Sequence, residues 1–147
     1  MVFDHDGYVD KFVGDELVAL FFPLLTGERY TARAIEAARA LLHATGHADP
    51  DGPWVPVGAG VHGGLAWFGV VGEGSHVELT AVGDVVNTTA RLASAAGPGE
   101  VLVSSDAAAA AGLDAIIPRR KLELKGKELA TEVISLRVDP PDTQPPH

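Results

Sequence analysis

The sequence contains no cysteine, which excludes a disulfide framework, a thiolate nucleophile and a cysteine-ligated zinc site, and suits a reducing cytosol. Positive charge is also scarce, because 11 Lys and Arg stand against 20 Asp and Glu, for a net charge of −9. Such a field repels phosphate backbones and anionic lipids, so we expect no nucleic-acid or membrane-surface partner. The longest apolar run, Leu17 to Leu25, is nine residues long and is interrupted by Pro23. A bilayer span needs roughly 20 residues. These absences together predict a cytoplasmic protein.

The residues that are present predict one folded domain. A length of 147 residues is typical of a single globular unit, and a hydrophobic content of 46% is sufficient for a core. The final segment, Asp139 to His147, has the sequence DPPDTQPPH and is too rich in proline to join a fold. We therefore expect a domain over residues 1–138 and a disordered tail over residues 139–147.

Strand-like and helical segments follow one another in an α+β order. Tyr8 to Phe22 predicts a hairpin that turns at Gly14-Asp15, because glycine tolerates the positive φ of a tight turn. Arg29 to Gly46 has apolar residues at helical spacing, and Asp84 is placed to cap a second helix, Val85 to Ala96. We expect strands over Trp54 to Gly64 and Leu65 to Gly72, paired with each other. The other expected elements are a strand over Glu100 to Ser104, a helix over Asp106 to Gly112, and strands near Arg120 to Leu124 and Thr131 to Arg137.

Two patterns that look like ligand sites are better explained as ordinary structure. Gly58 to Gly63, GAGVHG, has the three glycines of a dinucleotide-binding loop, but that loop must lead into a helix, and the sequence that follows is strand-like. His43 and His47 have the i, i+4 spacing of a metal-binding helix face but lack the intervening glutamate of a zinc-protease motif. We expect both histidines on the solvated surface and assign them no metal.

The second helix carries a more informative pair. Asn87 and Arg91 are neighbours at i and i+4, on the side opposite the apolar stripe. An ordinary solvated face explains them, because polar residues are expected there. An amide and a guanidinium can instead hold a sugar hydroxyl and a phosphate, since arginine presents a planar fork of donors. The residues alone leave both interpretations open.

Two turns allow the same choice between structure and chemistry. Asp15, beside Glu16, is either a common turn residue or a carboxylate that holds Mg²⁺ together with substrate phosphates. Lys125 and Lys127, on either side of Gly126, form either an exposed turn or a phosphate contact.

Taken in order, these segments resemble the catalytic domain of class III nucleotidyl cyclases, the adenylate and guanylate cyclase family. The matching segments are Lys11 to Pro23 (KFVGDELVALFFP), which resembles the family's Lys-x-x-Gly-Asp hairpin; Val57 to Gly72 (VGAGVHGGLAWFGVVG), its glycine-rich strands; Val82 to Ser104 (VGDVVNTTARLASAAGPGEVLVS), its Asn-x-x-x-Arg helix and Pro-Gly-Glu turn; and Leu124 to Lys127 (LKGK), its final turn. The resemblance spans about Gly7 to Leu136 and implies a ferredoxin-like sandwich, truncated at its N-terminus.

The resemblance also implies a role for each matching residue. Asp15 would be a ligand of a pair of Mg²⁺ or Mn²⁺ ions, and Lys11 and Thr80 would read the adenine edge of ATP. Asn87 would orient the ribose, Arg91 would stabilise charge on the α-phosphate, and Lys125 would hold the terminal phosphates. The implied reaction is attack of the ribose 3′-oxygen on the α-phosphorus, which gives 3′,5′-cyclic AMP and pyrophosphate. Because the family builds each site from two chains, a homodimer or pairing with a complete cyclase domain is implied. Threonine at position 80 also resembles a bacterial subgroup associated with bicarbonate responsiveness.

One part of the family pattern is absent. The family begins with a strand that carries a second metal-binding aspartate, followed by two helices, and no such segment precedes the Lys11 hairpin. Its loss is expected to leave unpaired backbone groups on neighbouring strands. We do not expect Asp4, Asp6 or Asp10 to replace that aspartate, since metal ligation needs a defined geometry. Either Met1 is a late start on a longer protein, which the retained motif residues favour, or the chain is a catalytically inactive module that binds ATP or pairs with a complete cyclase.

Overall fold

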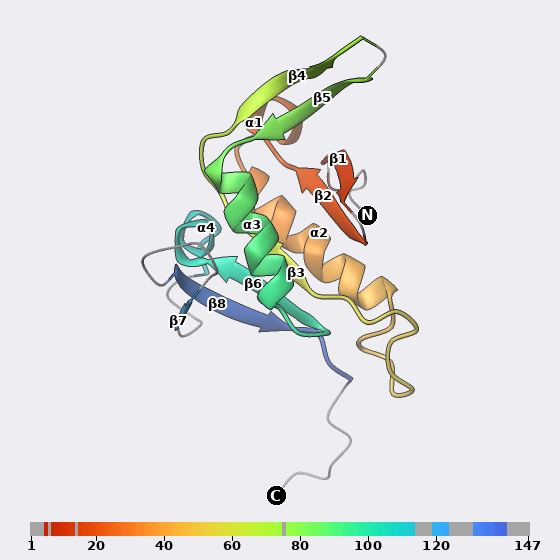
Figure 1. The fold of residues 1–147 in the computed structure, drawn as a ribbon. Helices are drawn as coiled ribbons and strands as arrows, with labels where there is room; N and C mark the ends of the chain where they lie inside the picture. Colours follow the sequence, from red (N-terminus) through yellow and green to blue (C-terminus); the bar gives the residue numbers. More distant parts are fainter. Residues whose placement is uncertain are drawn as a thin grey trace, which may run out of the picture.

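The computed structural model describes residues 5, 7–13, 15–74, 76–113, 119–123 and 131–140, and Figure 1 shows their arrangement. The elements in chain order are β1 (Tyr8–Val13), β2 (Glu16–Leu20), α1 (Pro23–Thr26), α2 (Tyr30–Ala44), β3 (Ala59–Val61), β4 (Trp67–Glu73), β5 (His76–Val82), α3 (Asp84–Ala95), β6 (Glu100–Ser104), α4 (Ser105–Ala110), β7 (Arg120–Leu122) and β8 (Thr131–Arg137). Among the described residues, none of the helices has the length and apolar character that a membrane crossing requires.

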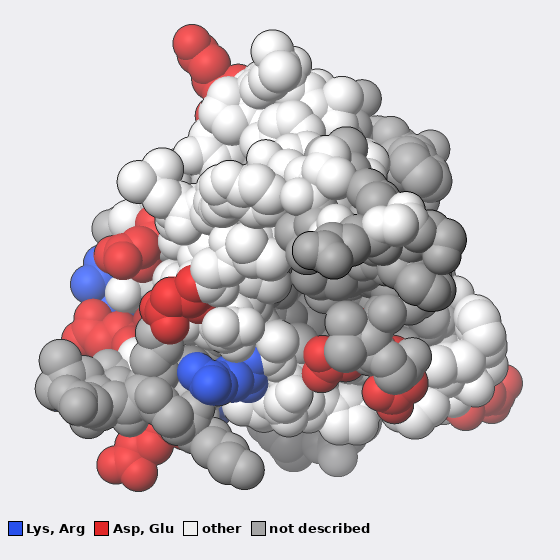
Figure 2. All heavy atoms as spheres, turned by 45° about the horizontal axis from the view of Figure 1, so that its top comes forward, with Lys and Arg blue, Asp and Glu red and all other residues white. Residues whose placement is uncertain are grey.

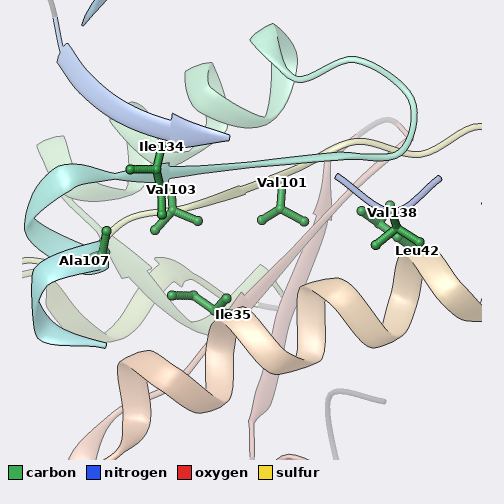
Figure 3. Close-up of a cluster of buried hydrophobic side chains, with 8 residues drawn as sticks. Ile35, Leu42, Val101, Val103, Ala107, Ile134 and Val138 are labelled. Carbon is green, nitrogen blue, oxygen red and sulfur yellow. The ribbon is translucent and has the colours of Figure 1, made fainter. Parts of the chain in front are cut away.

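The core is built around β6, all of whose residues are buried. This strand lies between β3 and β8 in a four-stranded sheet with the order β3-β6-β8-β7, parallel to β3 and antiparallel to β8. Because side chains alternate along a strand, Val101 and Val103 pack with Ile35 of α2, and Leu102 packs with Leu92 of α3. Helices α2 and α4 therefore cover one face of the sheet, where Figure 3 shows the larger apolar cluster, and α3 covers the other.

The predicted α+β fold is confirmed, and so are most of its elements. Strands β1 and β2 form the expected antiparallel hairpin, and α2 and α3 lie within two residues of their predicted bounds. The three-glycine segment leads from β3 through irregular residues into β4 and not into a helix, which removes the dinucleotide-binding interpretation. The turn around Gly126 and the residues beyond position 140 lie outside the described residues.

One predicted strand pairing is wrong. The segments Trp54 to Gly64 and Leu65 to Gly72 do not pair with each other. Instead β3 pairs with β6, and β4 pairs in antiparallel register with β5, a strand missing from the predicted elements. The reason is that β-propensity marks a segment as extended but does not choose its neighbour, which is set by packing of the whole chain. Hairpin β4–β5 projects from the molecule at the top of Figure 1.

The described strands do not form one continuous sheet. Hairpin β1–β2 makes its own two-stranded sheet, β2 is paired only with β1, and β3 is paired only with β6 among the described strands. One backbone edge of β2 and one of β3 thus have no strand neighbour in the part of the chain that the structure describes.

His47 is buried, and the prediction that it lies on the solvated surface is wrong, whereas His43 is exposed. Its Nδ1 lies 3.0 Å from Thr45 Oγ1 and 3.1 Å from Leu42 O, and its Nε2 accepts a hydrogen bond from Val57 N–H at 3.2 Å. Both ring nitrogens are therefore engaged within the chain. The ring fastens the loop after α2 to the segment that enters β3, an arrangement that helical spacing alone does not indicate.

Strand β3 and helix α3 approach each other closely because the strand segment is rich in glycine. A Cβ on Gly60 would lie 2.5 Å from Ala93 N and 2.8 Å from Leu92 Cβ, and a Cβ on Gly58 would lie 2.8 Å from Ala96 O. These separations are well inside the roughly 3.5–4.0 Å of an optimal non-bonded contact. The glycines are therefore required by the packing of α3 on the sheet, which sets the position of that helix.

We predict that Gly60→Ala destabilises the protein by about 1–3 kcal/mol, because the added methyl group overpacks the contact between β3 and α3. Thermal or denaturant unfolding measures the change. Gly63→Ala is the matched control, since a Cβ at Gly63 meets nothing within 4 Å and its φ is not positive. Equal stability of the two variants would contradict this account of the packing.

Glu100 joins the start of β6 to β8 and β7. Its carboxylate accepts hydrogen bonds from Ser135 Oγ, from Gly97 N–H at 3.0 Å and from Arg120 Nη2 at 3.3 Å. Burial by itself raises the pKa of the Glu100 carboxyl, but the hydrogen bonds from Ser135 and Gly97 and the charges of Arg120 and Arg137 outweigh it, so the pKa is lowered. The ionised carboxylate therefore stabilises the fold.

We predict that Glu100→Gln loses about 1–3 kcal/mol of unfolding free energy at neutral pH, the range for hydrogen bonds to a charged group. A lowered folded-state pKa means that this contribution is present above the unfolded value of 4.5 and is lost as the pH falls through the lower folded value. The difference between the two proteins should shrink on acidification below 4.5, measured by denaturant unfolding. Glu36→Gln, on the exposed face of α2, is the control. If the difference in unfolding free energy between Glu100→Gln and the unaltered protein did not change with pH, the role of the Glu100 charge would be contradicted.

Candidate functional site

Two hairpins and helix α3 meet on one side of the molecule. The Tyr8 ring of β1 packs edge-on against Phe68 of β4, with ring centroids 5.8 Å apart. Close to this contact, Asp10 Oδ2 of β1 accepts a hydrogen bond from Ala81 N–H of β5 at 3.5 Å. Helix α3 begins two residues after β5 ends, so β1, β5 and α3 are brought together. Their junction forms the candidate functional site.

Lys11 and Thr80 are placed on neighbouring strands of this junction. Lys11 follows Asp10 in β1, and Thr80 precedes Ala81 in β5, so each is one residue from the contact between the two strands. In the backbone register, Lys11 is opposite Val18 and Thr80 is opposite Gly69. The structure therefore brings together the backbone positions of the two residues predicted to read the base.

Helix α3 turns a polar side away from the sheet. Thr88 and Leu92 are buried, Asn87 is exposed and Arg91 is half-buried. Neither the Asn87 amide nor the Arg91 guanidinium makes a hydrogen bond or ion pair with another residue in the described part of the chain. In a chain with a net charge of −9, an arginine without a carboxylate partner among these residues is available to an anionic ligand.

The start of α3 differs from the prediction in one respect. Gly83, with φ of 141°, is the N-cap, and Asp84 is the first helical residue rather than the cap. No side chain makes a cap hydrogen bond there. The Asp84 carboxylate still lies in the first turn, where a negative charge interacts favourably with the helix dipole. A glycine is needed at the turn because few other residues adopt this backbone conformation.

Asp15 lies in the exposed turn of hairpin β1–β2. The next residue, Glu16, accepts a hydrogen bond from Ser94 Oγ of α3 at 3.1 Å, which ties the turn to the C-terminal half of that helix. No group of three or more potential metal ligands is found among the described residues. A single carboxylate in an exposed turn is the kind of ligand that Mg²⁺ accepts together with substrate phosphates and water, so Asp15 fits the predicted metal-binding role. Lys125 lies outside the described residues.

The contacts that assemble the site involve residues that the sequence does not mark. Asp10 meets a residue 71 positions away, and Glu16 meets one 78 positions away. No local spacing connects such partners, and the pattern of Asp4, Asp6 and Asp10 indicates only an acidic neighbourhood. The Lys-x-x-Gly-Asp and Asn-x-x-x-Arg spacings identify the segments of the site but not the contacts between them.

A model of the adenylate and guanylate cyclase catalytic domain matches residues 6–135. The match covers most of the chain. It includes α3 and hairpins β1–β2 and β4–β5, the elements that meet at the candidate site. The chain therefore belongs to the family of adenylate and guanylate cyclase catalytic domains.

Curated relatives of the chain are longer proteins. An uncharacterized protein of Mycobacterium tuberculosis is 37% identical over 104 residues, which cover 69% of this chain and 19% of that protein. An adenylate cyclase of Anabaena cylindrica is 30% identical over 95 residues, which cover 58% of this chain and 18% of that protein. The chain spans about a fifth of the length of these relatives.

Solved structures of cyclases share the fold. The guanylyl cyclase Cya2 superimposes with a TM-score of 0.75 at 22% identity, over 91% of this chain and 71% of that one. The adenylyl cyclase CyaB from P. aeruginosa superimposes with a TM-score of 0.66 at 22% identity, over 91% of this chain and 73% of that one. Both an adenylyl and a guanylyl cyclase are thus similar in fold, so this likeness does not choose between ATP and GTP.

We predict that Asn87→Ala and Arg91→Ala each change the free energy of unfolding by less than about 0.5 kcal/mol, as expected for surface substitutions. Neither side chain contributes a hydrogen bond or ion pair within the described residues. Leu92→Ala, on the buried side of the same helix, should lose about 2–5 kcal/mol. Denaturant unfolding of the three variants checks both statements, and a large loss in Arg91→Ala would assign that residue a structural role.

Proposed function

We propose that this chain is an adenylate cyclase catalytic unit that converts ATP into 3′,5′-cyclic AMP and pyrophosphate. One observation carries the proposal: α3, which carries Asn87 and Arg91, follows directly after β5 and is hydrogen-bonded through Ser94 to Glu16 of β2, so it adjoins the two hairpins that carry Lys11 and Thr80. A base, a ribose and a phosphate lie within a few ångströms of each other in a nucleotide. A nucleotide site therefore needs residues suited to the base, the ribose and the phosphate on neighbouring helices and strands.

Each residue has a distinct task in the proposed reaction. Lys11 and Thr80 bind the adenine edge, and the Asn87 amide holds the ribose so that its 3′-oxygen faces the α-phosphorus. The new bond from the 3′-oxygen to phosphorus forms as the bond to the pyrophosphate oxygen breaks, and negative charge grows on the phosphoryl oxygens. Arg91 donates to those oxygens, which favours the transition state over bound ATP. Lys125 is assigned to the terminal phosphates by resemblance.

A divalent ion is the implied cofactor. Asp15, in the exposed turn between β1 and β2, would contribute one carboxylate to Mg²⁺ or Mn²⁺, and the nucleotide phosphates would contribute further oxygen ligands. When bound, such an ion neutralises phosphate charge. The Glu16–Ser94 hydrogen bond holds the turn that carries Asp15 against the C-terminal half of α3. In the proposed homodimer, Asp15 of one chain serves the site whose Asn87 and Arg91 come from the other chain.

A homodimer is proposed as the working assembly. Residues 52–72 contain no Lys, Arg, Asp or Glu, and Trp67, Phe68 and Val70 of β4 are 53%, 41% and 62% exposed. Figure 2, which brings the β4–β5 end of the molecule forward, shows a broad area without charged residues. Exposed apolar area without charge is typical of a surface that a partner covers. A second copy, or a complete cyclase domain, is the partner that we propose.

The proposal is tested by incubating the chain with ATP and Mn²⁺ and measuring cyclic AMP, alone and mixed with a complete cyclase. Activity should depend on Arg91: Arg91→Ala should lower kcat by about 100-fold or more with a smaller change in KM, because its contact strengthens in the transition state. Arg39→Ala, which removes an exposed arginine on α2, is the matched control and should leave turnover unchanged. An equal effect of the two substitutions would contradict the assignment.

A second candidate is a catalytically inactive module that binds ATP or pairs with a complete cyclase. The observation that favours it is that the described residues hold no group of three or more potential metal ligands. Tight ATP binding that is lost in Lys11→Ala, together with no cyclic AMP formation in any mixture, would decide for this module. Failure of ATP to raise the melting temperature at all would remove the enzyme and the ATP-binding form of this module, and would leave only a pairing role.

A further inference from the structure

Strand β1 contains a β-bulge at Asp10. Val9 is opposite Ala19 of β2, and Lys11, two residues further along β1, is opposite Val18, the next residue of β2. Asp10 is therefore an extra residue in β1 that has no partner of its own in the register with β2. Without the bulge, Lys11 would be opposite Leu17. An inserted residue of this kind bends the strand and changes the register of every residue that follows. The register of Lys11 therefore depends on how Asp10 is held.

Asp10 is held by the strand that carries Thr80. Its Oδ2 accepts a hydrogen bond from Ala81 N–H at 3.5 Å, and Ala81 is 2% exposed. The other carboxylate oxygen, Oδ1, is also shielded from solvent. Removing a carboxylate from water is costly without hydrogen bonds to it. Asp10 as a whole is half-buried, and its shielded oxygen ties the carboxylate to the surrounding chain more closely than a fully exposed carboxylate would be.

We propose that Asp10 is a positioning residue that sets the selectivity of the site for the purine base. Lys11 and Thr80 lie immediately beside the two partners of the Asp10–Ala81 contact, and consecutive Cα atoms are only about 3.8 Å apart. The contact fixes the distance between β1 and β5 at the level of these two residues. Asp10 acts through them and does not itself touch the nucleotide. This inference rests on the proposed function, because it requires that the site bind a nucleotide.

A second contact between the hairpins shows why the polar one is needed. The Tyr8–Phe68 ring contact, two residues before Asp10, is apolar and edge-on, and ring pairs of this kind tolerate centroid separations of about 4.5–7 Å. It holds the hairpins together but leaves freedom to slide. A hydrogen bond from a backbone N–H to a carboxylate is directional, so even at 3.5 Å it favours one register of the two strands over the others. Asp10 thus supplies the precision that base recognition requires.

The test compares Asp10→Ala, Asp10→Asn and Asp51→Ala in the full chain. Binding of the unreactive α,β-methylene analogues of ATP and GTP and of tripolyphosphate is measured by calorimetry. Asp10→Ala should weaken binding of the ATP analogue about tenfold and reduce its preference over the GTP analogue, while tripolyphosphate binding changes less than twofold. Asp10→Asn should restore most of the preference, since its amide oxygen still accepts from Ala81 N–H. Asp51→Ala removes the same charge from an exposed loop and should behave as the unaltered protein.

The outcomes separate this inference from the proposed function. If Lys11→Ala and Thr80→Ala weaken binding of the ATP analogue but Asp10→Ala does not, the positioning role is wrong and nucleotide binding stands. If the unaltered chain binds neither analogue, the proposed function is wrong, and the inference is overturned with it. A loss of tripolyphosphate binding equal to the loss of ATP binding would also overturn it, because the effect would then be general unfolding of the site. Asp10→Ser, too short to reach Ala81 N–H, replaces the alanine variant if that variant does not fold.

Discussion

The packing of α3 on the sheet is the constraint on which the rest of the structure depends. Strand β6 is buried on both faces, so helices must cover both sides of it, and Leu92 is the residue through which α3 covers one side. Glycine at position 60 allows this helix to approach β3 more closely than any side chain would permit. Once α3 is fixed in this way, its opposite side, with Asn87 and Arg91, must face the hairpins and solvent. The position of the candidate site thus follows from core packing.

Electrostatics then determines what that side of α3 can bind. The chain has a net charge of −9, and its described arginines include several that are paired with carboxylates, such as Arg33 with Glu36 and Arg120 with Glu100. Arg91 has no such partner in the described part of the chain. An overall acidic protein repels long polyanions, but a cation without a local partner can still attract one compact anion. The acidic composition is therefore compatible with a nucleotide ligand and selects against larger ones.

The sequence predicted the elements that are marked by local patterns and failed where pairing is set by distant parts of the chain. The 3.6-residue periodicity of α2 and the turn between β1 and β2 are local, and both were confirmed. Strand β5 was missed although Val77, Leu79 and Ala81 alternate with Glu78 and Thr80, a period of two that indicates a strand. His47 was placed on the surface because its helical spacing carries no information about the loop that covers it.

The sequence by itself determined the family, the α+β class and the segments that carry the site, because these depend on residue types at fixed local spacing. Tertiary structure alone decided that β4 pairs with β5 and not with β3, and that Asp10 and Glu16 tie the hairpin to β5 and α3. The physical reason is that a hydrogen bond between residues more than 70 positions apart forms only after the intervening chain has folded. Local sequence selects the elements, and packing around β6 selects which of them meet.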